Sequence, residues 1–377
     1  MPSPDLAREA ERVLRICAAC MYCDGLCPVF PALTGKHEHS GAEKIYLANL
    51  CHNCRACWHD CQYAPPHPFA VNVPATLAAL RRESYADHVW PGALGRGFRR
   101  PALGAGIFVG VALAVMLMVL APHGSWAALH RARPGPGSFY AVAPLGLMIG
   151  LAGASAGWAV LSLVISTRRF WRAISGEARL RLSPRALKLA VADIVTLRHL
   201  DGGGPGCNET GPRFSRRRRI FHQIMVAGFV LLFAATLAAA FFQHFLGVMP
   251  PFAPMSLPVV LGVAGGVAVV VGAAGLLAIE AKSEREPSER GETRLNLVFL
   301  VMIEIVVLSG LALLLWRDTA AMGPLLALHL GLVTGFFAAV PASKALHAPF
   351  RAAAILRSAA ERLSRRRREA RNAATFE

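Results

Sequence analysis

Six long apolar stretches limit what this chain can fold into. They cover about residues 102–121, 139–166, 220–247, 256–280, 295–316 and 323–346. Each has about the length that crosses a bilayer, which is roughly 20 apolar residues, or is longer. The bilayer core offers no water to an unpaired backbone amide, so such a segment spans it as a helix. The sequence therefore predicts six membrane helices, and Pro341 predicts a kink in the last one.

Positive charge lies mainly on one side of these stretches. Four segments contain 29 Lys and Arg residues: 96–100, 167–219, 281–294 and 342–377. The other three loops contain only Arg131, Arg133 and Arg317. Loops rich in Lys and Arg stay in the cytoplasm. We therefore expect a multi-pass protein of the bacterial inner membrane with both termini in the cytoplasm.

The same distribution explains the formal net charge of +17. A charge of this size could indicate nucleic acid as a partner. However, the RRRR runs at 216–219 and 365–368 flank membrane segments, where they suit anionic lipid headgroups. The sequence therefore favours membrane lipid as a partner and predicts no nucleic acid.

The chain divides into three parts by composition. Residues 1–95 are polar and contain eight of the nine cysteines, residues 96–350 contain the apolar stretches and the long loop 167–219, and residues 351–377 form a basic tail. The segments around the cysteines read as helices and not as strands. We expect an all-α chain, with an α-helical ferredoxin-like domain followed by a six-helix transmembrane bundle.

Two cysteine runs share the spacing C-x2-C-x2-C-x3-C. The first contains Cys17, Cys20, Cys23 and Cys27, and the second contains Cys51, Cys54, Cys57 and Cys61. This spacing is typical of bacterial ferredoxins, in which each run gives its last cysteine to the [4Fe–4S] cluster of the other run. One cluster is therefore expected on Cys17, Cys20, Cys23 and Cys61. The other is expected on Cys51, Cys54, Cys57 and Cys27.

Zinc is the alternative for these cysteines. Zinc sites prefer paired C-x2-C units separated by a loop, so two triplets that are each followed by a fourth cysteine fit zinc poorly. No secretory signal precedes the first run, so we expect reduced thiols and not disulfides. One departure from the ferredoxin pattern is Gln62, which follows the second run where Pro28 follows the first.

Four histidines lie near the ends of apolar stretches, where ionisable side chains are rare and usually functional. His222 and His244 are 22 residues apart, and His329 and His347 are 18 apart. Each pair therefore shares one helix face and spans about 27–33 Å. Because the third and sixth stretches run in opposite directions, we predict two bis-histidine haem b sites, His222 with His347 inside and His244 with His329 outside. The simpler alternative is that each histidine merely lies at the membrane interface.

A glycine-rich segment, DGGGPGC, occupies residues 201–207 of the long loop. It lacks a preceding strand and the G-x-G-x-x-G spacing, so it is a weak candidate for a dinucleotide site. We expect it to bring backbone close to the ferredoxin-like domain or to a partner. Cys207 is isolated, and an isolated cysteine is more often buried than a metal ligand.

The membrane part resembles the cytochrome b subunit of respiratory nitrate reductase. The shared features are RIFH at 219–222 and the H-x17-H-x-P pattern from His329 to Pro349. In that family two helices carry the axial histidines, and a second histidine follows the first by ten residues. This chain has Leu232 at that place, so His244 would have to replace that ligand.

Over its whole length the chain resembles the tricarballylate utilisation family known as TcuB or CitB. The resemblance rests on the twin cysteine runs, on LDGGGPGCNE at 200–209 and on RRIFH at 218–222. It implies a membrane partner of a cytoplasmic FAD-dependent dehydrogenase that oxidises tricarballylate. Electrons would pass from FADH2 through two [4Fe–4S] clusters and one or two b-type haems to the quinone pool. The chain would be an electron-transfer subunit of an oxidoreductase, without chemistry of its own on the organic substrate.

Two other functions remain open from the residues alone. The chain could be a transporter or a redox sensor for tricarboxylic acids, although a carrier should show internal repeats or broken helices around a midplane site. Alternatively, it could serve a different flavin-linked dehydrogenase or a unit like heterodisulfide reductase. The sequence does not choose the substrate, because the substrate pocket would lie on the partner.

Overall fold

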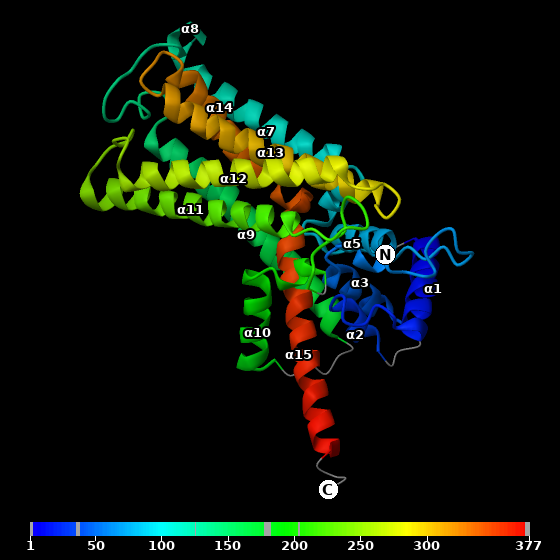
Figure 1. Cartoon of the computed structure of the whole chain (residues 1–377). Coiled ribbons are helices and arrows are strands. Elements are labelled where there is room, and N and C mark those ends of the chain that lie inside the picture. The colour runs from blue at the N-terminus through cyan, green and yellow to red at the C-terminus, as the bar shows by residue number, and fades with distance from the viewer. Residues whose placement is uncertain (1–2, 35–37, 125, 177–181, 203, 374–377) are drawn as a thin grey trace.

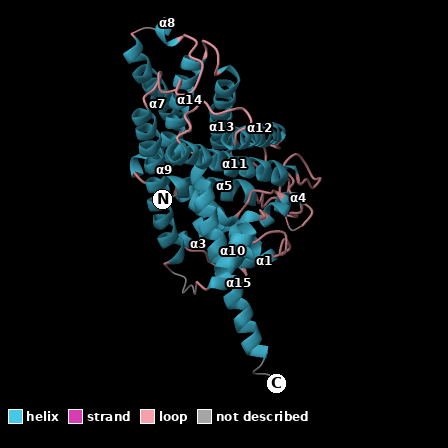
Figure 2. Ribbon diagram, turned by 90° about the vertical axis from the view of Figure 1, so that its left-hand side faces the viewer, coloured by secondary structure: helices cyan, strands magenta, loops and turns pink. Residues whose placement is uncertain are grey.

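The computed structural model describes residues 3–34, 38–124, 126–176, 182–202 and 204–373. Within these ranges the regular structure is helical, apart from one isolated bridge between Cys207 and Ser215. The all-α fold expected from the sequence is therefore confirmed. Figures 1 and 2 show the long apolar helices running side by side, with a separate helical body against one end of them.

Short helices build the N-terminal body. They are α1 (Pro4–Cys20), α2 (Val29–Leu33), α3 (Gly41–Leu50), α4 (Ala56–His59), α5 (Val73–His88) and α6 (Gly95–Arg99), with the 3₁₀ turn η1 (Gly92–Leu94) before α6. The three longest begin at polar caps, because the side chains of Ser3, Ser40 and Asn72 each accept a hydrogen bond from the backbone N–H three residues later. The first cysteine run begins on the last turns of α1, and the second begins directly after α3.

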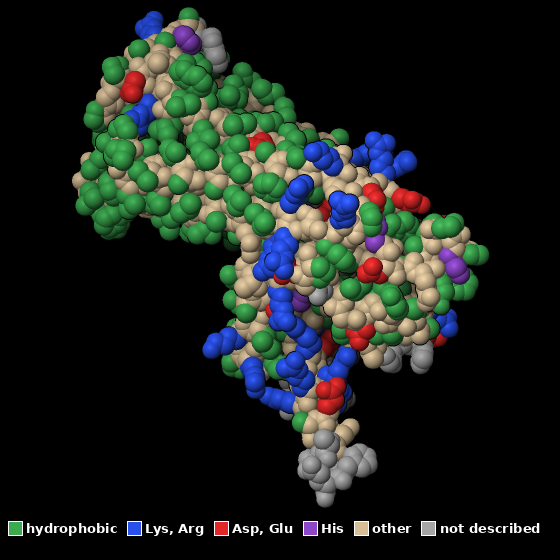
Figure 3. All heavy atoms as spheres, in the orientation of Figure 1, with side chains coloured by type: hydrophobic (Ala, Val, Ile, Leu, Met, Phe, Trp, Pro, Cys, Tyr) green, Lys and Arg blue, Asp and Glu red, His purple; other side chains and the backbone are tan. Residues whose placement is uncertain are grey.

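Six helices are long and apolar enough to cross a membrane, as the sequence predicts. They are α7 (Ala102–Leu120) with the turn η2 (Ala121–His123), α9 (Leu145–Ser175), α11 (Arg217–Leu246), α12 (Leu257–Lys282), α13 (Arg290–Trp316) and α14 (Met322–Ala339) with the turn η4 (Val340–Ala342). Only 17% of the most apolar window of α9 and of α11 is buried, against 61% for α14. Helix α14 is therefore central, and the exposed apolar surface of the others suits lipid (Figure 3).

The remaining elements lie at the ends of the bundle. They are α8 (Trp126–Leu129), α10 (Pro184–Val195), η3 (Arg198–Asp201), η5 (Lys344–Leu346) and α15 (His347–Ala373). Helix α15 packs against α10, α9 and α3, and it therefore joins the C-terminus to the N-terminal body. Figure 1 shows the far end of α15 extending beyond that body.

Two prolines change the expected boundaries of the membrane helices. The second helix begins at Leu145 and not at 139, because Pro144 directly precedes it and proline disfavours the helical conformation of the residue before it. Pro341 ends α14 where the sequence predicts a kink. The chain instead continues from Val340 to Leu346 in two 3₁₀ turns.

Glycines allow the closest helix pairs. A Cβ atom on Gly228 of α11 would lie 2.7 Å from the carbonyl oxygen of Gly265 on α12. A Cβ atom on Gly331 or Gly335 of α14 would lie within 2.5 Å of a carbonyl oxygen of α7. Small residues let membrane helices approach until their backbones touch, which replaces the hydrophobic driving force that lipid cannot provide.

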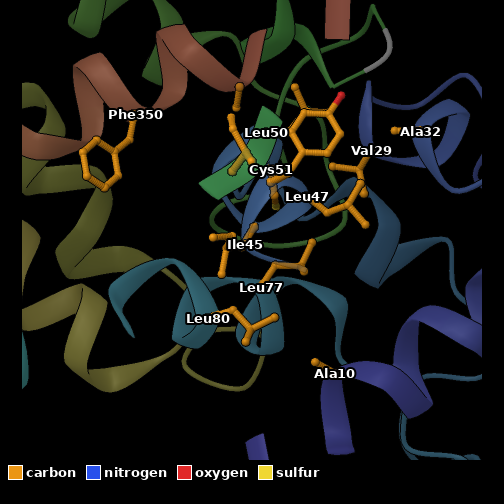
Figure 4. Packing of buried hydrophobic residues seen from close by; sticks show 14 of the residues in the cluster. Ala10, Val29, Ala32, Ile45, Leu47, Leu50, Cys51, Leu77, Leu80 and Phe350 are labelled. Atoms are coloured by element: carbon orange, nitrogen blue, oxygen red, sulfur yellow. The ribbon is translucent and has the colours of Figure 1, made fainter. Parts of the chain in front are cut away.

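The core of the N-terminal body continues into the membrane helices. It contains buried residues of α1, α3 and α5 together with Phe350 of α15 (Figure 4). Phe170 of α9 belongs to the same core. The rings of Phe170 and Phe350 stack at 4.3 Å between centroids, and Tyr85 of α5 packs edge-on against Phe350 at 5.5 Å. The body and the bundle therefore share one packed core on this side.

A buried ion cluster joins the same two parts. Glu292, in the first turn of α13, pairs with Arg81 of α5 at 3.1 Å and also with Lys344 of η5. All three side chains are buried. A buried carboxylate between two cations is stable only as a complete set, because each partner offsets the cost of removing the others from water.

We expect Glu292→Ala to lower the free energy of unfolding by about 3–5 kcal/mol, because it leaves two buried cations without a counter-charge. Chemical denaturation of the protein in detergent measures this change. Glu286→Ala is the matched control, since Glu286 lies on the adjacent loop with an exposed side chain. Equal stability of the two variants would contradict a role for the cluster in joining the body to the bundle.

Candidate cofactor sites

The first cysteine run lies around a small cavity at the end of α1. Met21 adopts a left-handed conformation with φ 49° and turns the chain after Cys20. The cavity has a volume of about 20 Å³, and five cysteines are among the residues that line it: Cys17, Cys20, Cys23, Cys57 and Cys61. Gln62, which replaces the proline of the ferredoxin pattern, lies with its Nε2 atom 3.7 Å from Sγ of Cys20. The last cysteine of the second run therefore lies with the thiols of the first run.

The charged groups nearest to Cys17 and Cys27 also connect the two cysteine runs. Burial raises the pKa of Cys17 to about 12, with further contributions from Cys61, Cys23 and Cys20. Burial also raises the pKa of Cys27 well above its usual value, and its charged neighbours are Cys54 and Cys51 of the second run. Neutral thiols are thus favoured until a metal supplies compensating positive charge. The two ligand sets themselves stay a prediction.

The arrangement of the cysteines also helps to distinguish a site for a single metal ion from a site for an iron–sulfur cluster. Within the described ranges, no three His, Cys, Asp or Glu side chains converge closely enough to hold a single metal ion. A [4Fe–4S] cluster takes one thiolate for each iron, so its four thiols surround a space and do not meet at one point. The thiols of the first run, arranged with Cys61 around a cavity, are compatible with that requirement.

The second cysteine run faces the membrane bundle. The carbonyl oxygen of Cys51 accepts hydrogen bonds from Arg81 at 2.6 Å and from Arg351 of α15 at 2.9 Å. The carbonyl oxygen of Asn53 accepts one from Arg218 of α11 at 2.9 Å. Three guanidinium groups from three helices therefore hold this loop, and they give its surroundings a positive charge.

The glycine-rich loop lies against the same run, as the sequence analysis expects. A Cβ atom on Gly202, which has φ 49°, would lie 2.0 Å from the carbonyl oxygen of Gly206 and 3.7 Å from Sγ of Cys54. The backbone N–H of Asn208 donates to the carbonyl oxygen of Cys54 at 2.7 Å. Cys207 is buried, and its thiol donates to the carbonyl oxygen of Leu200 at 3.0 Å. The loop therefore supports the second run through its backbone.

A large pocket lies between this run and the membrane helices. Its volume is about 710 Å³, which is within the range of small-molecule and cofactor sites. Polar side chains from the N-terminal body and from α10, α11, α12, α13, η5 and α15 line it, and they include His52, Arg81, Arg218, His222, Glu292, Lys344, His347 and Arg351. The pocket therefore borders both the second cysteine run and two of the four predicted haem ligands.

His222 and His347 lie close to each other at this pocket. Their ring centroids are 6.4 Å apart, and the rings are nearly perpendicular at 80°. Two imidazoles on one metal ion would be separated by two metal–nitrogen bonds of about 2 Å and two ring radii of about 1 Å, which agrees with this distance. Nδ1 of His347 lies 2.7 Å from the carbonyl oxygen of Lys344. A ligating histidine usually donates its second nitrogen in this way, which leaves Nε2 for the metal.

The outer pair is not brought together in the same way. His329 on α14 lies with Nδ1 2.9 Å from Oγ of Ser309 on α13. His244 is exposed near the end of α11. Within the described part of the chain, no ring contact joins His244 to His329, so the outer haem stays a prediction.

Sequence reasoning missed the arginines of the pocket, although a signal for two of them was present. Arg218 precedes His222 by four residues, and Arg351 follows His347 by four. Residues four apart lie on one face of a helix, so each arginine accompanies its histidine into the pocket. Arg351 reads as part of the basic tail, and Arg81 carries no signal, because its partners Cys51 and Glu292 are distant in the sequence.

Comparisons with known proteins cover nearly the whole chain. A family profile described as "Citrate utilization protein B" matches residues 96–370, and another described as "Citrate utilization protein B Fer4-like domain" matches residues 10–87. The chain is 40% identical over 360 residues to "Citrate utilization protein B" of Escherichia coli, which covers 94% of this chain and 92% of the relative. No solved structure matches. The chain therefore belongs to the citrate utilization protein B family, with a ferredoxin-like domain before its membrane helices.

Proposed function

We propose that this protein is a membrane-bound electron-transfer subunit, which takes electrons from a cytoplasmic flavoprotein dehydrogenase and delivers them to quinone. One observation carries the proposal. The second cysteine run and the histidine pair border the same pocket, and Arg81, Arg218 and Arg351 bond to that run and line that pocket. A route for electrons needs redox groups in a series of short steps, and this arrangement supports such a series from the N-terminal body into the bundle.

The chain's own residues would hold two [4Fe–4S] clusters and a b-type haem. The two cysteine sets would bind the clusters, and His222 and His347 would hold the haem through its iron. Arg218 and Arg351 would pair with its carboxylate groups, because guanidinium groups bind carboxylates well in partly buried sites. When bound, these groups supply reversible one-electron oxidation and reduction.

The direction of transfer and the partner belong to the same proposal. The Lys and Arg distribution supports a cytoplasmic N-terminal body, where a soluble donor could reach it. The name of the Escherichia coli relative connects that protein with citrate utilization. For this chain we propose a flavin-linked dehydrogenase of a tricarboxylic acid such as tricarballylate as the donor. Quinone would be reached from the bilayer.

The proposed function can be tested directly with the purified protein in lipid nanodiscs. The dithionite-reduced protein should show b-type absorption bands. Mixing with a menaquinone or ubiquinone analogue should reoxidise it, and the loss of the reduced bands measures this. Oxidation without a quinone, at the slow rate of residual oxygen, is the baseline. Haem that stays reduced in excess quinone would overturn delivery to quinone.

Substitution of one inner histidine should remove a haem. We expect His347→Ala to lose the absorption of one b-type haem, because His347 is one of two neighbouring histidines that line the pocket. His130→Ala is the control, since His130 is exposed and directly follows α8, which lies at the end of the bundle away from the N-terminal body (Figure 1). The pyridine haemochrome assay of both variants measures haem per chain. If the parent protein contains no haem, the haem part of the proposal is wrong.

Pairs of cysteine substitutions should show that the runs exchange their last ligands. Cys27→Ser with Cys51→Ser should remove one cluster and leave about four of about eight non-haem irons per chain. Cys27→Ser with Cys17→Ser should remove both clusters. The opposite pattern would mean that each run binds its own cluster. Cys207→Ser, which changes a thiol bonded to Leu200, should leave the iron content unchanged.

A further inference from the structure

Helix α10 presents an apolar face that no part of the described chain covers. Leu187, Val191 and Val195 follow one another at four-residue spacing, and their exposed fractions are 56%, 49% and 72%. The opposite face, with Ala186, Ala190 and Asp193, is buried, and α10 packs against α15. An amphipathic helix normally turns its apolar stripe toward the protein core, and here this stripe points outward.

The position of α10 is fixed at the point where a membrane helix begins. The carbonyl oxygen of Thr196, which directly follows α10, accepts hydrogen bonds from Arg219 at 2.7 Å and from Gln223 at 3.2 Å. Arg219 and Gln223 lie in the first two turns of α11, which starts at Arg217. On the other side, Asp193 pairs with Arg362 of α15. The C-terminal end of α10 is therefore held at the depth at which α11 enters the bilayer.

The apolar face of α10 also continues into the lipid-facing surface. Val195 lines the large pocket together with Val226 and Val230 of α11. Those two valines are 44% and 62% exposed, on a helix that is apolar enough to span a membrane. Figure 1 shows α10 running across the direction of α11, and Figure 3 shows hydrophobic side chains along the same edge of the molecule. A bilayer that surrounds α11 would therefore continue onto α10.

Charged residues frame this face in the way that lipid headgroups require. Arg185 and Lys188 are exposed on α10, and Arg168 and Arg172 are exposed near the end of α9. An amphipathic helix that lies in a membrane interface buries its apolar face among acyl chains while Lys and Arg contact anionic headgroups. Lipid accounts for both features, whereas water would leave three branched apolar side chains exposed.

We propose that α10 is an interfacial membrane helix. Its apolar face, Leu187, Val191 and Val195, lies in the leaflet on the side of the N-terminal body. The occupant of this face is phospholipid, with anionic headgroups near Arg185 and Lys188. The long segment between the second and third spans is thus in part a membrane anchor, where the sequence analysis expects only a cytoplasmic loop. This proposal does not depend on which redox groups the protein binds.

Photocrosslinking of the full chain in nanodiscs of phosphatidylethanolamine and phosphatidylglycerol tests the proposal. A benzophenone amino acid replaces Leu187 or Val191 in separate variants, and mass spectrometry measures the phospholipid adduct. Arg8 is the control position, because its side chain is exposed on α1. We expect an adduct yield at Leu187 and Val191 several-fold above that at Arg8. A yield equal to that of the control, or crosslinks mainly to a second copy of the chain, would overturn the proposal.

A charge-changing variant gives a second reading. Leu187→Asp with Val191→Asp alters only exposed side chains, so the fold should survive. Amide hydrogen exchange of 184–195 in the same nanodiscs should become several-fold faster in this variant, because carboxylates leave the acyl region and expose the helix. Ala192→Asp, which adds a carboxylate at an exposed position of α10 outside the apolar face, is the control for a general loss of helix stability. Unchanged exchange in the Asp variant would mean that lipid does not cover this face.

Discussion

The carboxylate of Glu292 is the interaction on which the arrangement of this molecule depends. It lies in the first turn of a membrane helix, and it binds Arg81 of the N-terminal body and Lys344 of the turn before α15. Arg81 in turn donates to the carbonyl oxygen of Cys51. A single buried charge therefore connects a membrane helix, the second cysteine run and the segment that carries His347. Because an incomplete buried set is costly, these three parts are held in one relative position.

This position has an electrostatic consequence for the second cysteine run. Arg81 and Arg351 both donate to the carbonyl oxygen of Cys51, and Arg218 donates to the carbonyl oxygen of Asn53. Cationic groups near an iron–sulfur cluster, together with hydrogen bonds, favour its reduced and more negative state. The first run has no such group of arginines among the residues that line its cavity. In the proposed function, this difference would favour electron movement from the first cluster toward the second.

Much of the fold follows from short-range patterns in the sequence. Apolar length predicts the six spans, and the cysteine spacing predicts a ferredoxin-like domain that the family profile also identifies. The helix ends were harder, because Pro341 ends a helix where a kink is equally consistent with its chemistry. The ion cluster of Arg81, Glu292 and Lys344 could not be predicted. Its members are up to 263 residues apart, counted from residue numbers 81 and 344, and none of them lies in a recognisable motif.

The four histidines show that helical periodicity alone does not identify a site. His222 and His244 share helix α11, but His329 lies on α14 and His347 at the start of α15, so the second pair does not share one helix face as the spacing predicts. Of the two predicted haem pairs, only His222 and His347 have rings in contact within the described residues. His222 and His347 each have an arginine four residues away, and they border a pocket that Arg81, Glu292 and Lys344 also line. His329 instead lies beside Ser309, and His244 is exposed. Helical spacing places two residues on one face of a helix. Whether a site forms on that face depends on the polar groups around it. In this chain, a histidine accompanied by an arginine four residues away is therefore the stronger sequence signal for a buried polar pocket.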